Sequence, residues 1–575
     1  MSAKLLLNSE VSIPEAILRV LEEAGIDMVF GIPGGQTGSI FNALYDHQST
    51  IRTVLVRQET LAGIMSEVYG RLTGKPAVAM GQGAFMVSNA MLGTLEAYCG
   101  SSPMLIMTDL SDGAPFSHHA PYQSGTGDYR TWNAQTVFSG VTKATFIPHG
   151  PAETVQCTQL AIKHALTGER GPVALLYHSA ALGGRVGPDS VPKLYSTQSY
   201  LPTSPPSADP TLVDTAAQTI LSAESPVIIA GNGVRVSGAY AQLQELAELV
   251  ATPVATTAAG KGIFPENHPL ALGVCGSFGQ RVANRTLAQA DVVLIIGSKL
   301  APNDTDGQNP QFLDPIRQNF IQLDIEPKNA GWTFPCDHVV IGDAAVALSQ
   351  LSDCIRDIGP PLDEILNVRK ARLLNKREEY GFFNDTEFTS DEIPLLPQRI
   401  IGEIRSGIDD DAIVTCDAGE NRLFMTHWFQ TRKAGTLVSP AATGGMGYAI
   451  PAALAAKLAS PSRRVVAVSG DGGFPMSMNG LITACEEEIP ITVVIFNNSA
   501  LGWVRSGQGN KQIASEFSDV NFAGIAQSMG CQGHRIEQPG ELEKVLKETA
   551  DSNITTVLDV VTSRKFTFRD VSSKF

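Results

Sequence analysis

The chain has 575 residues, a length that predicts about three or four domains of roughly 100–200 residues each. Its apolar fraction of 43%, its charged fraction of 17% and its formal net charge of −16 are those of an acidic globular protein without lysine- or arginine-rich runs, so we expect no nucleic-acid partner. No apolar run predicts a membrane span, and the first residues lack the features of a signal peptide, so we expect a cytoplasmic protein. The cysteines are scattered without a C-x-x-C pair, so we expect neither a zinc site nor a disulfide framework.

The first predicted domain covers residues 1–188 and begins with an amphipathic helix at Ile13–Glu23. Short apolar runs bounded by glycine or proline are its predicted strands, namely Met28–Ile32, Val54–Val56, Ala77–Met80 and Met104–Met107. Because these runs alternate with helical stretches, they predict a mostly parallel sheet covered by helices.

A second domain is predicted for residues 211–355, after a proline- and serine-rich linker at residues 192–210. Its buried strands are predicted at Pro226–Val234, Thr252–Thr257, Asp291–Leu300 and Asn319–Ile325. They indicate a second doubly wound sheet. The charged stretch Asn367–Tyr380 that follows is expected to form a solvated helix.

A third domain is predicted for residues 390–575. Its strands are predicted at Ala412–Gly419, Arg464–Gly473, Ile491–Asn498 and Thr555–Val561. The first and third domains have a similar size and a similar alternation of strands and helices, without a repeat at the level of residues. The predicted fold class is therefore α/β, with three doubly wound parallel-sheet domains.

The most informative stretch is Ser469–Trp503, where one apolar strand runs into Gly470-Asp471-Gly472-Gly473 and the next strand ends at Asn497-Asn498. The carboxyl ends of neighbouring parallel strands meet at the edge of the sheet, where α/β folds bind ligands. Carboxylate and amide oxygens there suit Mg²⁺ or Ca²⁺, and the glycines allow backbone N–H groups to approach a phosphate. Two ordinary turns are the alternative, which the spacing and the strand context disfavour.

This pattern resembles the motif of thiamine-diphosphate enzymes, GDG followed one strand later by NN. The resemblance implies that Asp471, Asn498 and the main-chain carbonyl of Ala500 ligate Mg²⁺. The cofactor-binding residues that it implies are Gly419, Glu420, Asn421, Gly444, Met446, Gly470, Asp471, Gly472, Gly473, Asn498 and Ala500. Glu420 and Asn421 differ from the Gln-His pair that is common in acetohydroxyacid synthases.

Two further segments are similar to the same family. Arg57–Met80 resembles the run R-x-E-x-x-A, which implies that Glu59 is the glutamate that activates the cofactor through its pyrimidine ring. An acidic residue at a helix N-terminus is common for electrostatic reasons alone, so this interpretation depends on the metal motif. Ala442–Ala456 resembles G-x-M-G-Y-x-x-P-A-A, which implies that Met446 is the hydrophobic wedge that bends the cofactor and that the Gly444 carbonyl accepts from its aminopyrimidine.

Departures from the family pattern affect the expected reaction. Simple pyruvate decarboxylases have an aspartate after FGIPG, whereas this chain has Gly35 followed by Gln36. The loss of an acid there favours carboligation over the release of an aldehyde. The family's G-P-G-A-T-N reads Gly81–Met86 here, so Gln82 and Phe85 predict an altered substrate pocket.

Other substrate-side segments match less well. Gln123 resembles the glutamine of synthases and oxidases, and His118-His119 resemble the paired histidines of decarboxylases, with a solvated pair as the alternative. Ser506–Ala514 does not match the acceptor region of branched-chain acetohydroxyacid synthases, which puts a role in branched-chain amino-acid synthesis in doubt. Gly297–Gly307 lacks the Arg-Phe-Asp-Asp-Arg pattern of flavin-binding synthases, so FAD binding stays open.

The resemblance spans nearly the whole chain and is to the acetolactate synthase, pyruvate oxidase and 2-oxoacid decarboxylase group of thiamine-diphosphate enzymes. It implies that the three domains are a pyrimidine-binding, a middle and a diphosphate-binding domain. It also implies a homodimer or homotetramer in which two subunits complete the active site.

We predict an acetolactate-synthase-like carboligase that decarboxylates a 2-oxo acid such as pyruvate and transfers the acyl anion to a second carbonyl compound. The candidate catalytic residues are Glu59, Gln123, His118, His119, Gln36 and Gln82. The alternative is a 2-oxoacid decarboxylase or a C–C lyase, including one that acts on an acyl-CoA or a cyclic diketone. A non-catalytic relative is the least favoured, because Glu59, Asp471 and Asn498 are intact.

Overall fold

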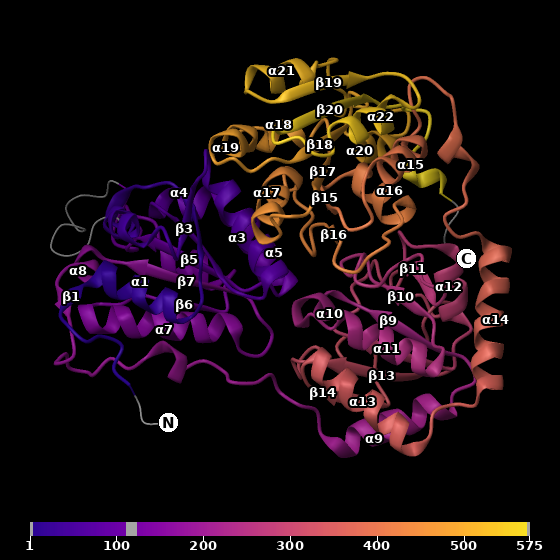
Figure 1. Ribbon diagram of the computed structural model, residues 1–575, viewed down its shortest axis with the longest axis horizontal. Coiled ribbons are helices and arrows are strands. Elements are labelled where there is room, and N and C mark those ends of the chain that lie inside the picture. The colour runs from indigo at the N-terminus through magenta and orange to yellow at the C-terminus, as the bar shows by residue number, and fades with distance from the viewer. Residues whose placement is uncertain (1–3, 111–122, 572–575) are drawn as a thin grey trace. The chain divides into compact units, whose positions relative to one another are not determined.

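The computed structural model describes residues 4–110 and 123–571 and contains three domains built on parallel sheets (Figure 1). Each domain has a six-stranded sheet in which all neighbouring strands are parallel. The predicted fold class is therefore confirmed. Among the residues that the structure describes, none of the helices combines the length and the apolar character that a membrane crossing requires.

The first domain has the strand order β3-β2-β4-β5-β7-β6. Its strands are β2 (Met28–Gly31), β3 (Arg52–Leu55), β4 (Ala77–Gly81), β5 (Met104–Asp109), β6 (Ala144–Phe146) and β7 (Pro172–Tyr177). Its helices are α1 (Ile13–Glu23), α2 (Gly38–Leu44), α3 (Glu59–Thr73), α4 (Gly83–Asn89), α5 (Met91–Gly100), α6 (Ala134–Ser139), α7 (Pro151–Leu166) and α8 (Ser179–Leu182). β2, β4, β5 and β7 are buried along their whole length, as expected for a parallel sheet covered on both faces.

Helix α1 begins where the sequence predicts it. The Ser12 side chain accepts a hydrogen bond from the Glu15 backbone N–H, and Pro14 lies in the first turn, where its missing N–H costs nothing. The apolar residues of the helix recur at helical spacing and are buried against the core of the first domain.

The middle domain has the strand order β11-β10-β9-β12-β13-β14, the arrangement of a dinucleotide-binding sheet. Its strands are β9 (Pro226–Ala230), β10 (Val254–Thr256), β11 (Ala271–Val274), β12 (Val292–Ile296), β13 (Asn319–Asp324) and β14 (His338–Ile341). Its helices are α9 (Pro210–Ser222), α10 (Asn232–Ser237), α11 (Tyr240–Val250), α12 (Arg281–Ala288), α13 (Ala344–Ile358) and α14 (Asp363–Tyr380).

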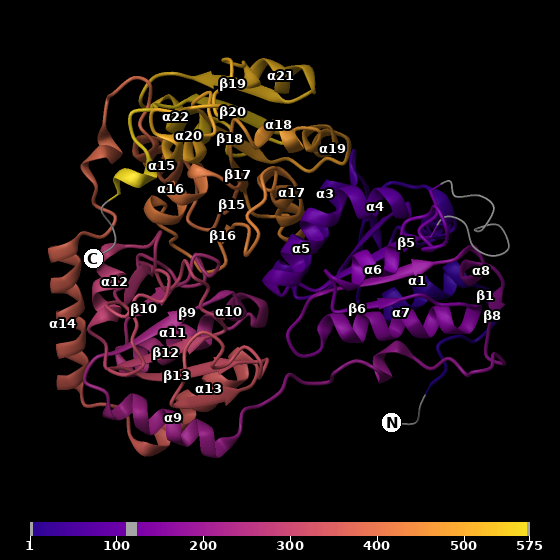
Figure 2. The ribbon, with the colours of Figure 1, turned by 180° about the vertical axis from the view of Figure 1, so that it is seen from behind.

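Helix α14 is less solvated than the sequence predicts. Seen from both sides, it runs along the edge of the middle domain (Figure 2). Arg369 is buried and donates to the Val250 carbonyl at 2.6 Å, and Arg377 donates to the His268 carbonyl at 2.8 Å. The charged sequence therefore supplies donors for helix-end and loop carbonyls that α14 covers.

The third domain has the strand order β16-β15-β17-β18-β20-β19. Its strands are β15 (Ile413–Cys416), β16 (Leu437–Val438), β17 (Val465–Gly470), β18 (Thr492–Asn497), β19 (Gln532–Ile536) and β20 (Thr556–Val561). Its helices are α15 (Pro397–Gly407), α16 (Glu420–Trp428), α17 (Ala449–Ala459), α18 (Phe474–Ser477), α19 (Gly480–Glu486), α20 (Gly502–Gln508), α21 (Phe522–Ser528) and α22 (Glu541–Glu548). The candidate residues that the structure describes lie in the loops, or in the first turns of the helices, that follow strands of the first and third sheets, where α/β folds bind ligands.

Candidate active site

Two strand ends of the third domain bring the predicted metal ligands together. β17 and β18 pair so that Gly470 lies opposite Phe496, and Asp471 and Asn498 therefore leave the sheet close to one another. Asp471 Oδ2 and Asn498 Oδ1 both accept a hydrogen bond from the Ala500 backbone N–H, at 3.2 and 3.1 Å. Two side-chain oxygens thus converge on one turn.

The electrostatics of this turn favour a cation. Asp471 is 5% exposed, and burial raises the pKa of its carboxyl group to about 6, although backbone N–H groups of the turn act in the opposite direction. A buried carboxylate is stabilised by a bound cation, which offsets its lost hydration. Among residues 4–110 and 123–571, no group of three or more histidine, cysteine, aspartate or glutamate side chains is arranged to hold a metal ion. A magnesium ion here would therefore need phosphate oxygens as further ligands, which is its usual mode of binding.

The backbone of this turn is strained at Ser499. Its φ of 52° lies in the left-handed region, which costs a non-glycine residue about 1–2 kcal/mol. The Ser499 carbonyl accepts hydrogen bonds from the Phe517 backbone N–H at 2.8 Å and from the Arg564 guanidinium at 2.7 Å. Strain of this kind persists where the surrounding contacts determine the conformation, and it is concentrated at functional sites.

The glycine-rich turn after β17 leaves no space for side chains. A Cβ on Gly472 would lie 3.0 Å from Met446 Cε, and a Cβ on Gly473 would lie 2.7 Å from Asp417 Oδ2. Gly444, two residues before Met446, has a φ of 65°, a conformation that favours glycine. The structure therefore brings the segment after β16 against the turn that carries Asp471.

Asp417 begins the segment that resembles the diphosphate-contacting segment of the family, but the sequence predicts no individual role for it. It follows β15 directly and is fully buried. Its Oδ1 accepts from the backbone N–H groups of Ala418, Gly447 and Tyr448, at 2.8, 2.8 and 3.2 Å, and its Oδ2 accepts from the Ser469 hydroxyl at 2.9 Å. Asp417 thus fixes the segment after β16 to the ends of β15 and β17. An aspartate directly after a buried strand, as at position 471, was the available signal.

The two residues predicted to contact a diphosphate differ in their surroundings. Asn421 Oδ1 would lie 3.3 Å from a Cβ on Gly470, so it reaches the glycine-rich turn. Glu420 Oε1 instead accepts from the Thr567 hydroxyl at 2.6 Å and from the Phe568 backbone N–H at 2.9 Å, and burial raises the pKa of this carboxyl group. Their roles toward the cofactor stay predictions.

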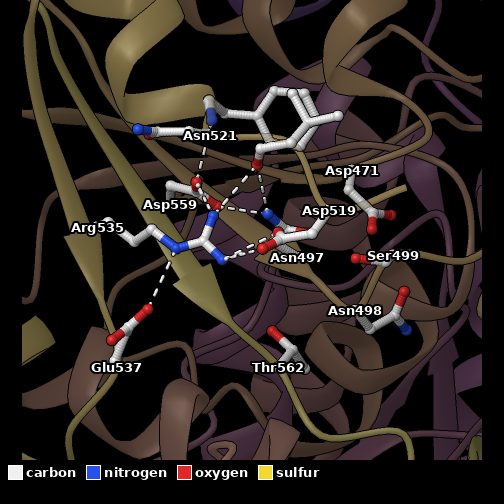
Figure 3. A network of polar contacts seen from close by, with 12 residues as sticks. Asp471, Asn497, Asn498, Ser499, Asp519, Asn521, Arg535, Glu537, Asp559 and Thr562 are labelled. Atoms are coloured by element: carbon white, nitrogen blue, oxygen red, sulfur yellow. Dashed lines mark hydrogen bonds and ion pairs between the residues drawn. The ribbon is translucent and has the colours of Figure 1, made fainter. Parts of the chain in front are cut away.

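A second network supports the end of β18 (Figure 3). The Asn497 side chain donates to Asp559 Oδ1 at 2.8 Å, and the fully buried Asp559 also pairs with Arg535 at 3.1 Å. Arg535 donates to both oxygens of Asp519, at 2.9 and 3.0 Å. The network fixes the side chain of Asn497, the residue before the proposed ligand Asn498. Its members come from segments too distant in sequence to be recognised as a motif.

In the first domain, Glu59 is the first residue of α3 and is 8% exposed. Its Oε2 accepts a hydrogen bond from the Asn89 side chain at 2.9 Å, and the Thr60 hydroxyl donates to the Asn89 carbonyl at 2.9 Å. Asn89 is therefore a neighbour of Glu59 that the sequence reasoning missed. It holds one oxygen of the carboxylate in place at the start of the helix.

Three predicted glutamines follow strands of the same sheet. The Gln82 side chain donates to Gln123 Oε1, so the structure brings these two together. Gln36 follows β2, and its backbone N–H donates to the buried Asp109. Gln123 has a φ of 57°, so its backbone is strained in the same way as that of Ser499.

Asp109 connects two of these loops. It accepts from the Gln36 backbone N–H at one oxygen and from the Gly83 backbone N–H at the other, at 3.1 Å for the second. Gly35, with a φ of 56°, lies so close that a Cβ there would be 2.0 Å from Asp109 Oδ2. A side chain at position 35 would therefore collide with Asp109 in this structure. The predicted His118 and His119 lie outside the residues that the structure describes.

Comparison with protein families matches each domain in turn. Residues 12–125 match the N-terminal TPP binding domain of thiamine pyrophosphate enzymes, residues 213–351 match their central domain, and residues 417–560 match their C-terminal TPP binding domain.

Individual relatives match over almost the full length. The chain is 31% identical to a probable acetolactate synthase large subunit of Methanocaldococcus jannaschii, over 95% of this chain and 91% of the relative. It is 29% identical to the acetolactate synthase isozyme 3 large subunit of Escherichia coli, over 97% and 94%. It is 27% identical to a putative thiamine pyrophosphate-containing protein of Bacillus subtilis, over 95% and 91%. The chain belongs to the acetolactate-synthase-like family of thiamine-pyrophosphate-dependent enzymes.

Proposed function

We propose that the protein is a carboligase that decarboxylates a 2-oxo acid such as pyruvate and transfers the resulting acyl group to a second carbonyl compound. Relatives named as acetolactate synthase large subunits, which match from one end of the chain to the other, support this reaction class.

The observation that carries the choice between ligation and simple decarboxylation is the packing of Gly35. A decarboxylase that releases an aldehyde needs an acid at this loop to deliver a proton to carbon. Here a side chain at position 35 would meet Asp109 Oδ2 at 2.0 Å, and the Asp109 oxygens are engaged by two backbone N–H groups. The loop offers glutamine amides, which donate hydrogen bonds without transferring a proton. A second carbonyl compound is then the better acceptor.

The residues of the third domain fit thiamine diphosphate and magnesium. The buried Asp471 carboxylate, the Asn498 amide oxygen and the Ala500 carbonyl are the proposed magnesium ligands. The glycines of the turn carry no side chain that would keep a phosphate away from the backbone N–H groups, which is why we propose that the diphosphate binds there. When bound, the cofactor supplies a thiazolium carbon that adds to the carbonyl of the 2-oxo acid and an electron sink for the loss of CO₂.

The remaining steps belong to side chains of the first domain. Glu59 is proposed to hold a proton shared with the aminopyrimidine ring at the carboxylate oxygen that Asn89 does not engage. The Gln82 and Gln123 amides are proposed to orient the substrate carboxylate or carbonyl, because amide groups supply both donors and acceptors.

Product analysis tests this proposal. Purified protein is incubated with Mg²⁺, thiamine diphosphate and pyruvate, with and without an aldehyde acceptor, beside the Glu59→Gln variant, and the products are identified by mass spectrometry. We expect acetolactate, or a mixed acyloin when the aldehyde is present, from the wild type and not from the variant. Acetaldehyde as the sole product would contradict carboligation and select the decarboxylase. Without any product from pyruvate, the same assay with larger 2-oxo acids identifies the donor.

The proposed assembly is a homodimer or homotetramer, in line with the resemblance. Light scattering on the purified protein measures its mass directly. The visible absorbance spectrum of the same sample decides whether FAD is bound.

A further inference from the structure

Arg564 lies outside every matched family segment, yet it contacts the turn that carries the proposed metal ligands. It follows β20 on the C-terminal segment. Its Nε donates to the Asn498 carbonyl, and its Nη2 donates to the Ser499 carbonyl at 2.7 Å. A planar guanidinium with two parallel donors suits two successive carbonyl oxygens, whereas a lysine ammonium does not.

The two carbonyls belong to the strained part of the turn. Ser499 has a φ of 52°, so its carbonyl is directed by a backbone conformation that a serine rarely adopts. The next carbonyl along the chain is that of Ala500, the proposed main-chain ligand. The conformation at Ser499 orients the peptide unit that leads into Ala500, and so contributes to the direction of the Ala500 carbonyl.

Arg564 also makes an ion pair, which contributes less to its position. Its Nη1 lies 3.3 Å from Glu516 Oε1, and this glutamate is about half exposed and also bonded by Arg505 at 2.9 Å. An exposed ion pair of this kind adds little stability. The specific contribution of Arg564 is thus its pair of hydrogen bonds to the turn.

We propose that Arg564 is a positioning residue for the magnesium site: it holds Ser499 in the left-handed conformation and so directs the Ala500 carbonyl toward the ion. The inference rests on the proposed metal site. It does not require Arg564 to touch the ion, the cofactor or the substrate.

The first test measures binding without turnover. The variants are Arg564→Ala, Arg564→Lys and the matched control Arg505→Ala, which removes a cation from the same glutamate without a bond to the turn. Mg²⁺ is titrated into the protein at saturating thiamine diphosphate, with no substrate, and followed by calorimetry or tryptophan fluorescence. Thermal melting of the cofactor-free proteins controls for folding.

We expect Arg564→Ala to raise the Mg²⁺ concentration for half-saturation by about tenfold, which corresponds to about 1.4 kcal/mol. kcat at saturating Mg²⁺ should fall less than about threefold, because the ion restores the turn once it is bound. Arg564→Lys should lie between, and it serves as the decisive variant where Arg564→Ala does not fold. Arg505→Ala should bind Mg²⁺ as the wild type does. Equal half-saturation for Arg564→Ala and Arg505→Ala would overturn the inference.

The second test uses the strained residue itself. Glycine adopts the left-handed conformation without cost, so in a Ser499→Gly background the loss of Arg564 should matter less. We expect the tenfold effect of Arg564→Ala to shrink to less than about threefold, a non-additivity that a double-mutant cycle measures. A full tenfold effect in that background would contradict the proposed role. If the wild-type protein bound no Mg²⁺ in the presence of thiamine diphosphate, the proposed metal site would itself be wrong, and the role of Arg564 would fail with it.

Discussion

The first and third domains have the same strand order but different chemistry. When the strands of each sheet are numbered along the chain, their order across both of these sheets is 2-1-3-4-6-5. The order across the middle sheet is 3-2-1-4-5-6. Because ligand sites form at the carboxyl ends of such strands, corresponding loops can be compared. The third strand is followed by Gln82 in the first domain and by Asp471 in the third, and the loop after the second strand leads to Glu59 or to Met446.

The difference between these loops indicates how one scaffold serves two tasks. The third domain presents carboxylate and amide oxygens with a glycine-rich turn, which are the groups that hold an ion and a phosphate. The first domain presents glutamine amides and the Glu59 carboxylate, which are groups that can orient substrates and move protons. Function thus resides in the loops, and the shared strand order by itself carries none of it.

The largest expected effect comes from the carboxylate of the first domain. Glu59→Gln should lower kcat by about 10²–10⁴, the usual contribution of a positioned proton-transfer group. Its affinity for Mg²⁺ and thiamine diphosphate should stay within about tenfold of the wild type. Steady-state kinetics and calorimetry separate the two. A variant that loses cofactor affinity as strongly as activity would remove the proposed division of tasks.

Asp471→Asn should have the opposite signature. Loss of the buried carboxylate should weaken Mg²⁺ and thiamine diphosphate binding by more than about 100-fold, since even an indirect partner of a metal ligand contributes 10- to 100-fold. The cofactor-free variant should melt at a higher temperature than the cofactor-free wild type, because burial disfavours the charge at position 471. Differential scanning calorimetry measures both states. A lower melting temperature of the cofactor-free variant would mean that Asp471 stabilises the fold by itself.

Two glycines of the first domain provide a smaller and purely structural contrast. Gly35→Ala should cost more than about 1 kcal/mol of unfolding free energy, because position 35 has a positive φ and a Cβ would collide with Asp109. Gly38 has a φ of −53° and open space around it, so Gly38→Ala should stabilise by up to about 1 kcal/mol. Urea unfolding of both variants checks the pair. Similar stability of the two would refute the steric explanation for Gly35.

The smallest expected effect concerns pH in the first domain. Burial lowers the pKa of His47, but hydrogen bonds to Glu22 at 2.8 Å and Glu15 at 2.9 Å outweigh it, so the pKa lies above its usual value. The stability that this histidine contributes is complete below the ordinary histidine pKa and is lost as pH rises through the raised value. Urea unfolding across this range should show the loss in the wild type and not in His47→Gln. If the unfolding free energies of the wild type and His47→Gln changed with pH in the same way, this role of His47 would be contradicted.

The sequence was sufficient where a local pattern determines the structure. The start of α1 follows from Ser12 and Pro14, its buried face follows from the apolar spacing, and β17 and β18 follow from long buried runs. The two-residue strand β16 was not predicted, because so short a run has no periodicity of its own and depends on pairing with β15.

The candidate site divides in the same way. Glu59, Asp471 and Asn498 occur in motifs that a sequence displays. The structure places Glu59 at the start of α3, where it is buried and hydrogen-bonded, and Asp471 and Asn498 just after β17 and β18. Asn89 and Arg564 were missed, because their contacts join segments that are distant in the chain and have no spacing rule. A surface arginine after the last strand gives no signal until the turn that it contacts is known.

The central claim is that Glu59 activates the cofactor. Its most direct test is the rate at which the proton on the reactive thiazolium carbon, C2, exchanges with deuterium, followed by NMR on enzyme samples quenched in acid. It requires bound thiamine diphosphate and an activating carboxylate, but no knowledge of the substrate. We expect rapid exchange in the wild type, exchange slowed by about 10²–10⁴ in Glu59→Gln with the cofactor still bound, and no protein-accelerated exchange in Asp471→Asn at cofactor concentrations that saturate the wild type. Exchange in Glu59→Gln as fast as in the wild type would contradict the assignment of activation to the first domain.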